Sequence, residues 1–233
     1  MTLPPLWLSQ LTGKIKNYIR YYGIGILKFF RKFQPERHQL TSTTSYNRYP
    51  ELFHATRAAM QHTNPRTLKI LSFGCSTGEE CFSLAGYFPE ASILGVDINR
   101  FNLFRARLRN TYPRIQFAYS APEIIAKHAP YDLIFCLSVL CRWEDTKDVT
   151  NCASIYPFQK FEQTVTELAG WLKPGGLLVI YNSNFRFEDT AIAASFTTMP
   201  VSLPNSGFVH KFDRNNNRIY EVHQNCIYRK ADS

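Results

Sequence analysis

Residues 68–97 constrain the fold and function of this chain more than any other segment. An apolar strand over Leu68–Phe73 runs into a turn that contains Gly74 and Gly78, and a helix follows that opens with two acids. A second apolar strand ends at Asp97, nineteen residues after Gly78. This arrangement predicts a nucleotide-type binding site. The two glycines are expected to let the backbone approach a ligand, and Asp97 is expected to accept hydrogen bonds from a ribose.

The acids that open this helix argue against a phosphate ligand. Phosphates bind at helix N-termini, where the positive end of the helix dipole favours anions. Here Glu79 and Glu80 occupy the first turn, and the chain contains neither G-x-G-x-x-G nor G-x-x-x-x-G-K-[ST]. Two carboxylates suit a ligand with positive charge. S-adenosylmethionine, a nucleoside with a cationic centre and no phosphate, fits this description.

The run Gly-Cys-Ser-Thr-Gly-Glu-Glu at residues 74–80 resembles motif I of the class I S-adenosylmethionine-dependent methyltransferases. It is most similar to the variant found in CheR-type chemotaxis-receptor methyltransferases, and the wider resemblance extends over roughly residues 66–230. Two positions depart from the commonest pattern. Ser76 replaces a middle glycine, as in the CheR-like variant. Ser72 replaces an acid and removes one expected contact toward the methionine amino group, for which Glu79 or Glu80 would compensate.

The resemblance also implies which residues hold the cofactor. They lie at the carboxyl ends of successive strands, where ligands of open α/β sheets bind. The turn after the third strand borders the adenine ring in this family. The implied cofactor-binding residues are Gly74, Cys75, Ser76, Thr77, Gly78, Glu79, Asp97, Ile98, Ser120, Ala121 and Leu137.

Strand and helix patterns alternate downstream, which predicts an α/β fold with a Rossmann-like, mostly parallel sheet and helices on both faces. A C-terminal antiparallel β-hairpin and a basic N-terminal helical extension complete the predicted architecture. Ser120 is expected to cap a helix. The expected strands cover 115–119, 131–137 and 177–181, the helices cover 49–60, 99–109, 120–127 and 158–172, and the hairpin covers 207–212 and 218–228.

The polar segment after the fifth strand is the main candidate for the acceptor side. Asn182 and Asn184 could orient an acceptor, Arg186 could hold a carboxylate or phosphate bidentately, and Glu188 could serve as a base. The alternative is a surface loop whose acids cap a following helix, and both interpretations stay open. A catalyst is expected to have an open cleft beside Asn184, which a binding module could fill. Residues 142–145 form a second candidate patch, with a solvated loop as the alternative.

Other classes of site find little support in the sequence. No catalytic histidine is assigned, because methyl transfer can proceed largely by positioning the two reactants in line. The six cysteines form no C-x-x-C pair and no cysteine–histidine cluster has zinc-ligand spacing, so a reducing compartment and no metal are expected. Ser138–Cys141 stands where methyltransferases of nucleic-acid bases often carry [DNS]-P-P-[YFW], so a nucleic-acid substrate is not expected.

Residues 1–40 form a basic arm with seven basic residues and one acid. Apolar residues recur at helical spacing between residues 15 and 33, as in an amphipathic helix. Three interpretations stay open: the helix packs on the catalytic domain, residues 14–33 make peripheral contact with an anionic membrane, or the arm binds nucleic acid or another acidic partner. The longest run of apolar residues in the arm is too short for a helix that spans a bilayer.

The sequence therefore predicts three parts: the arm over 1–40, a linker and cofactor-covering helix over 41–65, and a class I methyltransferase domain over 66–233. Tyr46, Arg48 and Tyr49 could touch the ligand. The predicted reaction moves a methyl group from S-adenosylmethionine to oxygen or nitrogen of a small molecule, lipid or glycan, in the cytoplasm or at the membrane surface. The alternatives are a CheR-like protein carboxyl methyltransferase and a non-catalytic module that binds membrane or partner through the arm.

Overall fold

The computed structural model describes residues 37–60 and 68–232. The chain divides into two units, Met1–Leu40 and Thr41–Ser233, and the fold described below is that of the second. The predicted basic helix and its membrane contact through residues 14–33 lie outside the described residues. Among the helices that the structure describes, none is long and apolar enough to cross a membrane.

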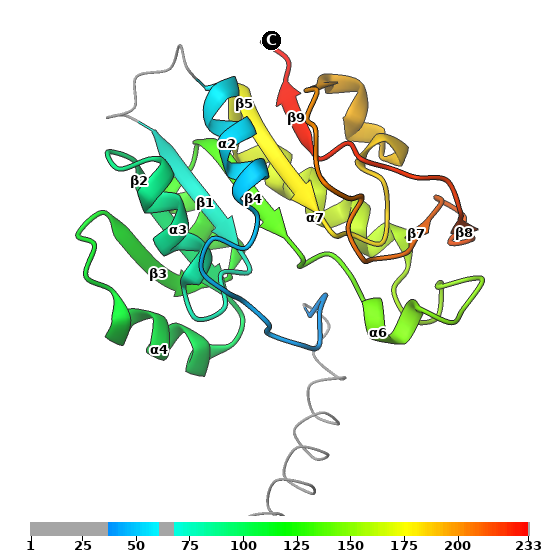
Figure 1. Ribbon diagram of the computed structural model, residues 1–233, viewed down its shortest axis with the longest axis horizontal. Helices are drawn as coiled ribbons and strands as arrows, with labels where there is room; N and C mark the ends of the chain where they lie inside the picture. The colour runs from blue at the N-terminus through cyan, green and yellow to red at the C-terminus, as the bar shows by residue number, and fades with distance from the viewer. Residues whose placement is uncertain (1–36, 61–67, 233) are drawn as a thin grey trace, which may run out of the picture. The chain divides into compact units, whose positions relative to one another are not determined.

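The described part of the second unit is built on a sheet of seven strands in the order β3-β2-β1-β4-β5-β9-β6 (Figure 1). Strands β1 to β5 pair in parallel, whereas β9 is antiparallel to both β5 and β6. This arrangement confirms the predicted α/β fold with a mostly parallel sheet. The strands are β1 (Lys69–Phe73), β2 (Ser92–Asp97), β3 (Ile115–Tyr119), β4 (Tyr131–Leu137), β5 (Leu172–Tyr181), β6 (Phe196–Thr198) and β9 (Ile227–Lys230).

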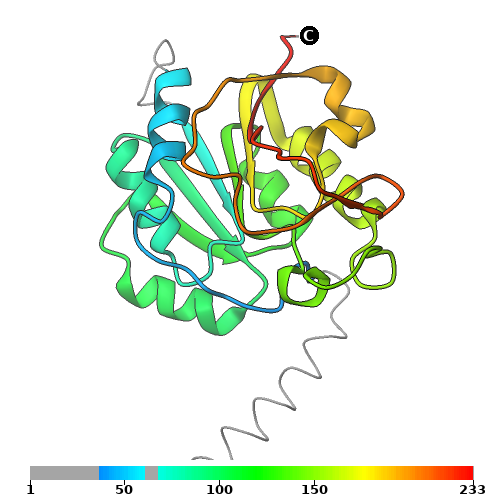
Figure 2. The ribbon, with the colours of Figure 1, turned by 45° about the vertical axis from the view of Figure 1, so that its right-hand side comes forward.

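Helices cover both faces of the sheet, because consecutive strand residues point to opposite sides. Ile70 of β1 belongs to the apolar cluster that includes α2 and α3, and its neighbour Leu71 belongs to the cluster that includes α5 and α7. Figures 1 and 2 show α2 and α7 on opposite sides of the strands. The helices are α2 (Pro50–Ala59), α3 (Glu79–Tyr87), α4 (Arg100–Arg109), α5 (Pro122–His128), α6 (Trp143–Thr146) and α7 (Phe158–Trp171).

The C-terminal part of the sheet differs from the prediction in three ways. Strand β5 begins at Leu172 and not at 177, with a register shift against β4. The predicted hairpin is present but short, as β7 (Lys211–Phe212) and β8 (Arg218–Ile219), because the following segment joins the main sheet as β9 and buries Ile227 and Tyr228. Two short 3₁₀ turns, Phe187–Asp189 and Ala191–Ser195, stand where the surface-loop interpretation placed a helix, and they lead into β6.

The expected helix cap at Ser120 is also corrected by the structure. The N-cap position of α5 is Ala121, which forms no side-chain cap, and Pro122 is the first helical residue. Proline suits this position because its fixed φ is already helical and its missing N–H has no intrahelical partner there. The proline therefore starts the helix without help from Ser120.

The strand order reverses at β1. The chain passes outward from β1 through β2 to β3 and then returns to place β4 on the other side of β1. Ligands of open parallel sheets bind beyond the carboxyl ends of the strands at such a reversal. The carboxyl ends of β1 and β4, at Phe73 and Leu137, therefore mark the place where a ligand site is expected.

Candidate functional site

Asp97 ties together the loops that follow β1 and β2. Its Oδ2 accepts a hydrogen bond from the backbone N–H of Ser76 at 2.8 Å, and its Oδ1 accepts one from the backbone N–H of Asn99 at 2.7 Å. The backbone N–H of Gly74 donates to the carbonyl of Val96 at 2.8 Å. A carboxylate oxygen can accept more than one hydrogen bond, so Asp97 can hold the loop and still accept ligand hydroxyls.

The two glycines of this loop serve the packing of the chain itself. Gly74 and Gly78 have φ values of +84° and +94°, which side chains rarely tolerate. A Cβ on Gly74 would lie 2.4 Å from Cγ2 of Val139, and one on Gly78 would lie 2.9 Å from Cζ of Phe117. Both glycines are therefore required by the packing of the loop, and their expected contact with a ligand stays a prediction.

The acid Glu79 is compensated within the protein. Thr77 Oγ1 donates to its Oε2 at 2.6 Å, and Arg109 pairs with its Oε1. Burial opposes ionisation of this carboxyl, but the hydrogen bonds from Thr77 and Arg109 outweigh burial and lower the pKa of Glu79. Glu79 therefore stays charged and already has its partners.

The neighbouring acid Glu80 is in a different state. Its Oε1 accepts a hydrogen bond from Ser72 Oγ at 2.7 Å. Burial raises the pKa of Glu80 to about 7, although the Ser72 hydrogen bond and the charge of Arg48 act in the opposite direction. Ser72 and Glu80 together place a carboxylate at the end of β1. Of the two acids expected to compensate for Ser72, Glu80 is the one bonded to it.

The remaining residues of the predicted cofactor site follow the same edge of the sheet. Cys75, Ser76 and Thr77 are buried in the loop after β1. Ile98 follows β2, Ser120 and Ala121 follow β3, and Leu137 ends β4. Ser120 lies beside the end of β2, because its backbone N–H donates to the carbonyl of Asp97 at 3.1 Å. The structure thus gathers these predicted residues at the carboxyl ends of β1 to β4.

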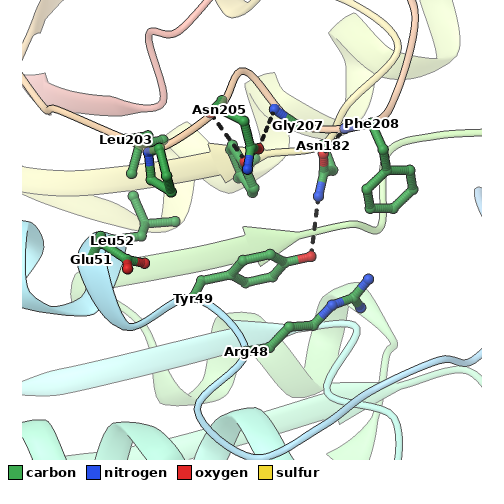
Figure 3. A pocket seen from close by; sticks show the side chains of 11 residues that line it. Arg48, Tyr49, Glu51, Leu52, Asn182, Leu203, Asn205, Gly207 and Phe208 are labelled. Atoms are coloured by element: carbon green, nitrogen blue, oxygen red, sulfur yellow. Dashed lines mark hydrogen bonds between the residues drawn. The ribbon is translucent and has the colours of Figure 1, made fainter.

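Three polar side chains, Tyr49, Ser138 and Asn182, meet beyond the ends of β4 and β5, and Figure 3 shows Tyr49 and Asn182. The hydroxyls of Tyr49 and Ser138 lie 2.7 Å apart, and Nδ2 of Asn182 donates to each of them at 3.1 Å. Burial raises the pKa of Tyr49, so its hydroxyl stays neutral. Ser138 and Asn182 have φ values of +57° and +54°, a strained conformation that often occurs at functional sites.

A pocket of about 410 Å³ opens beside this cluster, within the size range of small-molecule sites. Its far wall is residues 203–208, whose segment runs alongside α2 in Figure 2. The backbone N–H of Phe208 donates to Oδ1 of Asn182 at 3.1 Å. The lining residues are Arg48, Tyr49, Glu51, Leu52, Tyr181, Asn182, Leu203, Pro204, Asn205, Gly207 and Phe208.

Asn184 is placed differently, although it is only two residues further along. It is fully buried, and its Oδ1 accepts from the backbone N–H of Arg142 at 2.6 Å. Its Nδ2 donates to Thr146 Oγ1 at 3.1 Å and to the carbonyl of His210 at 3.0 Å. The amide of Asn184 therefore holds three segments together. The open cleft expected beside it lies instead beside Asn182.

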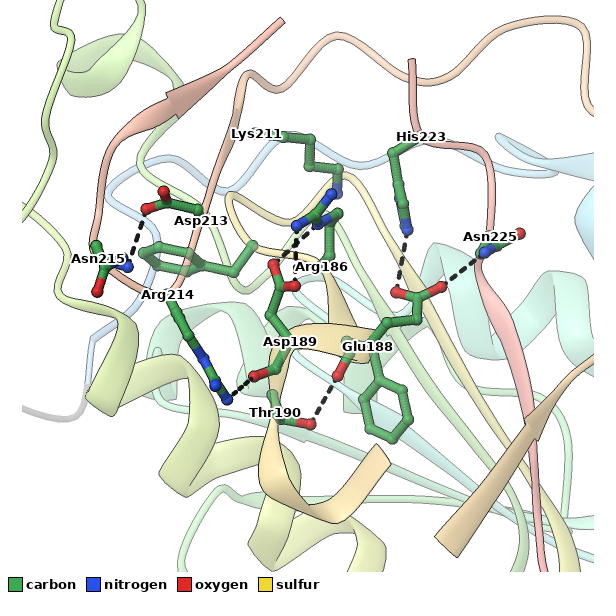
Figure 4. Close-up of polar contacts among 12 residues, drawn as sticks. Arg186, Glu188, Asp189, Thr190, Lys211, Asp213, Arg214, Asn215, His223 and Asn225 are labelled. Atoms are coloured by element: carbon green, nitrogen blue, oxygen red, sulfur yellow. Dashed lines mark hydrogen bonds and ion pairs between the residues drawn. The ribbon is translucent and has the colours of Figure 1, made fainter. Parts of the chain in front are cut away.

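Arg186 and Glu188 are each held by polar partners within the protein (Figure 4). Arg186 forms a bidentate ion pair with Asp189, with both distances at 2.9 Å. Glu188 accepts from Asn225 Nδ2 at 2.7 Å and lies 3.0 Å from His223 Nε2. Burial opposes ionisation of Glu188, but these contacts outweigh burial and lower its pKa to about 2. Of the four predicted acceptor-side residues, Asn182 alone lines the 410 Å³ pocket.

Sequence reasoning missed part of this pocket. Ser138 entered the sequence analysis only as the start of the segment that stands in place of [DNS]-P-P-[YFW], and its positive φ left no signal in the sequence. Residues 203–208 follow no motif or periodicity that would place them opposite Tyr49. In the second predicted patch, Trp143 contacts this pocket through Phe208, with ring centroids 5.7 Å apart.

All six cysteines are buried and free of disulfides. Within residues 37–60 and 68–232, no group of three or more histidine, cysteine, aspartate or glutamate side chains has the arrangement of a metal site.

Comparison with known protein families bears on this geometry directly. Residues 71–178, which contain the end of β1, the glycine loop, Asp97 and strands β2 to β4, match the family model of a methyltransferase domain. This segment of the chain is therefore similar to a methyltransferase domain. The CheR-type resemblance of motif I is a finer statement that this match does not address, and it stays a prediction.

Two curated relatives of this methyltransferase domain are O-methyltransferases. The chain is 32% identical over 118 residues to a malonyl-[acyl-carrier protein] O-methyltransferase of Halalkalibacterium halodurans, covering 47% of this chain and 37% of that protein. It is 22% identical over 166 residues to a fatty-acid O-methyltransferase of Mycolicibacterium smegmatis, covering 70% and 54%. The chain thus spans between about a third and a half of the length of these relatives.

Solved structures of methyltransferases also resemble the chain. A SAM-bound amino pentose methyltransferase from Micromonospora echinaspora is 20% identical, with a TM-score of 0.43, over 69% of this chain and 59% of that chain.

Proposed function

We propose that this protein transfers a methyl group from S-adenosylmethionine to an acceptor oxygen or nitrogen on a small molecule, lipid or glycan. The observation that carries the proposal is the placement of Asp97 and Glu80 at the strand-order reversal of a methyltransferase domain. The oxygen acceptors of both curated relatives favour oxygen here. Membrane contact through residues 14–33 rests on the sequence pattern alone.

The residues at the reversal fit the chemistry of this cofactor. The carboxylate of Asp97 can accept the two ribose hydroxyls, which are hydrogen-bond donors. Glu80 is a partly buried carboxyl whose pKa of about 7 shows that the fold itself does not fully compensate its charge. The methionine ammonium would supply that compensation. When bound, S-adenosylmethionine provides an electrophilic methyl carbon attached to positively charged sulfur.

The pocket beside Asn182 supports a catalyst over a non-catalytic module. A binding module could fill the acceptor side with its own side chains. Here about 410 Å³ is open beside Tyr49, Ser138 and Asn182, next to the carboxyl end of β4. These three side chains can position an acceptor, and their neutral hydroxyl and amide groups offer both donors and acceptors.

The test is calorimetric titration with S-adenosylhomocysteine of the wild-type protein and of Asp97→Ala. Loss of charged hydrogen bonds at Asp97 is expected to weaken binding by about 100-fold. Asp132→Ala is a matched control. Asp132 also accepts a backbone N–H, that of Lys69 at 2.8 Å, but it lies near the start of β4, away from the carboxyl end. Affinity unchanged in Asp97→Ala, with both variants folded, would contradict the assigned site.

A further inference from the structure

The 410 Å³ pocket has two chemically different ends (Figure 3). Arg48, the Tyr49 hydroxyl and Asn182 lie toward one end, and Leu52 and Leu203 lie toward the other. The polar end adjoins Ser138, the first residue after β4, through the hydrogen bonds of Tyr49 and Asn182. An acceptor in this pocket would therefore present its polar group next to the cofactor site and its apolar part away from it.

The charge at the polar end is positive. Arg48 Nη1 donates to the carbonyl of Thr43 at 2.9 Å, and the guanidinium lies 5.1 Å from the ring centre of Tyr49 and 5.9 Å from that of Phe208. These contacts hold the guanidinium in place and engage one of its five N–H groups. Among the described residues, no carboxylate forms an ion pair with Arg48, although its charge acts at longer range on Glu80. The N–H groups of the guanidinium that do not bond Thr43 are therefore left for a ligand.

The pocket contains one acid, and that acid lies at the other end. Glu51 is exposed and lies beside Leu52 in Figure 3, away from Arg48 and Asn182. An exposed carboxylate is screened by water, so it offsets the charge of Arg48 only weakly. The polar end itself contributes a neutral tyrosine, a serine and an amide, which are poor general bases. An alcohol or ammonium acceptor would have to lose a proton there.

From this arrangement we propose that the acceptor is a carboxylate with an apolar chain, held by Arg48 and positioned by Tyr49 and Asn182. This inference rests on the proposed methyl transfer. A carboxylate is already ionised at neutral pH, so it needs no base. One carboxylate oxygen uses its electron pair to form a bond to the methyl carbon while the carbon–sulfur bond breaks. That bond's electron pair stays on sulfur, the two opposite charges cancel, and no proton is released.

The experiment titrates octanoate and its neutral analogue octanamide into the full-length protein, with and without saturating S-adenosylhomocysteine. Octanoate is expected to bind at least about tenfold more tightly than octanamide, as a charge-assisted bidentate contact predicts. Arg48→Gln is expected to remove this preference and Arg48→Lys to keep part of it, with S-adenosylhomocysteine binding retained in both. Arg57→Gln, an exposed change in the last turn of α2, is the control and should leave every affinity unchanged.

Two results would overturn the proposal. One is equal binding of octanoate and octanamide by the wild-type protein. The other is an Arg48→Gln variant that keeps octanoate but loses S-adenosylhomocysteine, since Arg48 would then serve the cofactor. A different result would show that the proposed methyl transfer itself is wrong. A wild-type protein that binds octanoate through Arg48 but does not bind S-adenosylhomocysteine would retain a carboxylate site and exclude the methyltransferase function.

Discussion

Two carboxyl groups of this protein, Glu80 and Glu188, have pKa values shifted in opposite directions. Both are partly buried, and burial alone disfavours the charge of each. Glu188 gains donors from His223 and Asn225, and its pKa falls to about 2. Glu80 gains one hydroxyl donor, and its pKa rises to about 7. The region around Glu188 is therefore complete within the fold, whereas the region around Glu80 leaves charge to be compensated by a ligand.

The two asparagines after β5 repeat this contrast. Asn184 uses its amide to join three segments in the interior, and Asn182 points its amide toward the pocket with Tyr49 and Ser138. Two asparagines only two residues apart can thus lie in different environments, one beside a pocket and one in the interior. Both amides are buried and hydrogen-bonded, so the two asparagines differ in that Asn182 lines the pocket and Asn184 does not.

The largest effect is expected for Asn184→Ala, which tests whether the closed region is structural. Removing a buried amide leaves the backbone N–H of Arg142 and the hydroxyl of Thr146 without this partner, and the free energy of unfolding should fall by about 2–4 kcal/mol. Chemical denaturation measures it. Asn215→Ala, at an exposed turn position, is the control and should change stability by less than about 0.5 kcal/mol. Equal losses in the two variants would contradict the structural role of Asn184.

The open region is tested by pH. Protonation of Glu80 removes the charge proposed to hold a cationic ligand, so S-adenosylhomocysteine should bind about tenfold more weakly at pH 6 than at pH 8. Calorimetry across this range measures the change. Glu80→Gln should bind weakly at both pH values, whereas Glu79→Gln should keep the pH dependence, because the pKa of Glu79 is lowered. A pH-dependent Glu80→Gln variant would rule out Glu80 as the titrating group.

The contribution of Glu80 to the stability of the fold should change with pH in the opposite direction to ligand affinity. The folded-state pKa of Glu80 lies above that of the unfolded chain, so the folded protein favours the neutral carboxyl. This contribution to stability is present at acidic pH and is lost as the pH rises toward about 7. Tight ligand binding and the intrinsic stability of this site therefore have different pH optima.

Asn182→Gly should separate activity from stability. Glycine tolerates the φ of +54° at this position but lacks the amide that holds Tyr49 and Ser138. We expect kcat/KM for methyl transfer to fall about tenfold, with a smaller loss of stability than in Asn184→Ala, because the relieved strain offsets part of the lost hydrogen bonding. Asn182→Ala removes the same amide without relieving the strain, so it should be the less stable of the two. A fully active Asn182→Gly variant would show that the amide has no part in positioning.

The smallest effect is expected for Glu188→Gln. The side chain is a third exposed, so solvent screening limits its contribution, and the variant should lose about 1 kcal/mol at pH 7 without losing methyl transfer. Because its folded-state pKa is lowered, this stability is present above about pH 4.5 and is lost as the pH falls toward about 2. Denaturation of both proteins between pH 7 and pH 3 should show the difference shrinking. A Glu188→Gln variant that keeps its stability but loses most of its activity would support the predicted acceptor-side role of Glu188.

The sequence predicted the central sheet well, because β1 to β4 are short apolar runs bounded by clear turn residues and separated by helices. It failed for β6 and β9, whose pairing depends on burial of Ile227 and Tyr228 and not on local pattern. The glycine loop and Asp97 were found because their spacing is itself the signal. The pocket wall at residues 203–208 was not, since loop conformation and contacts far apart in sequence leave no periodicity.

The position of β9 has a consequence for synthesis on the ribosome. Strand β6 pairs with β9 in the described sheet, yet β9 is translated about 30 residues later, or about 2–6 s at typical elongation rates. During that interval β5 has an uncovered edge and β6 has no sheet partner. Each nascent chain therefore exposes two unpaired strand edges, which can pair with those of neighbouring chains. Stalling within this window should make polysome-bound chains more prone to aggregate than stalling after residue 230.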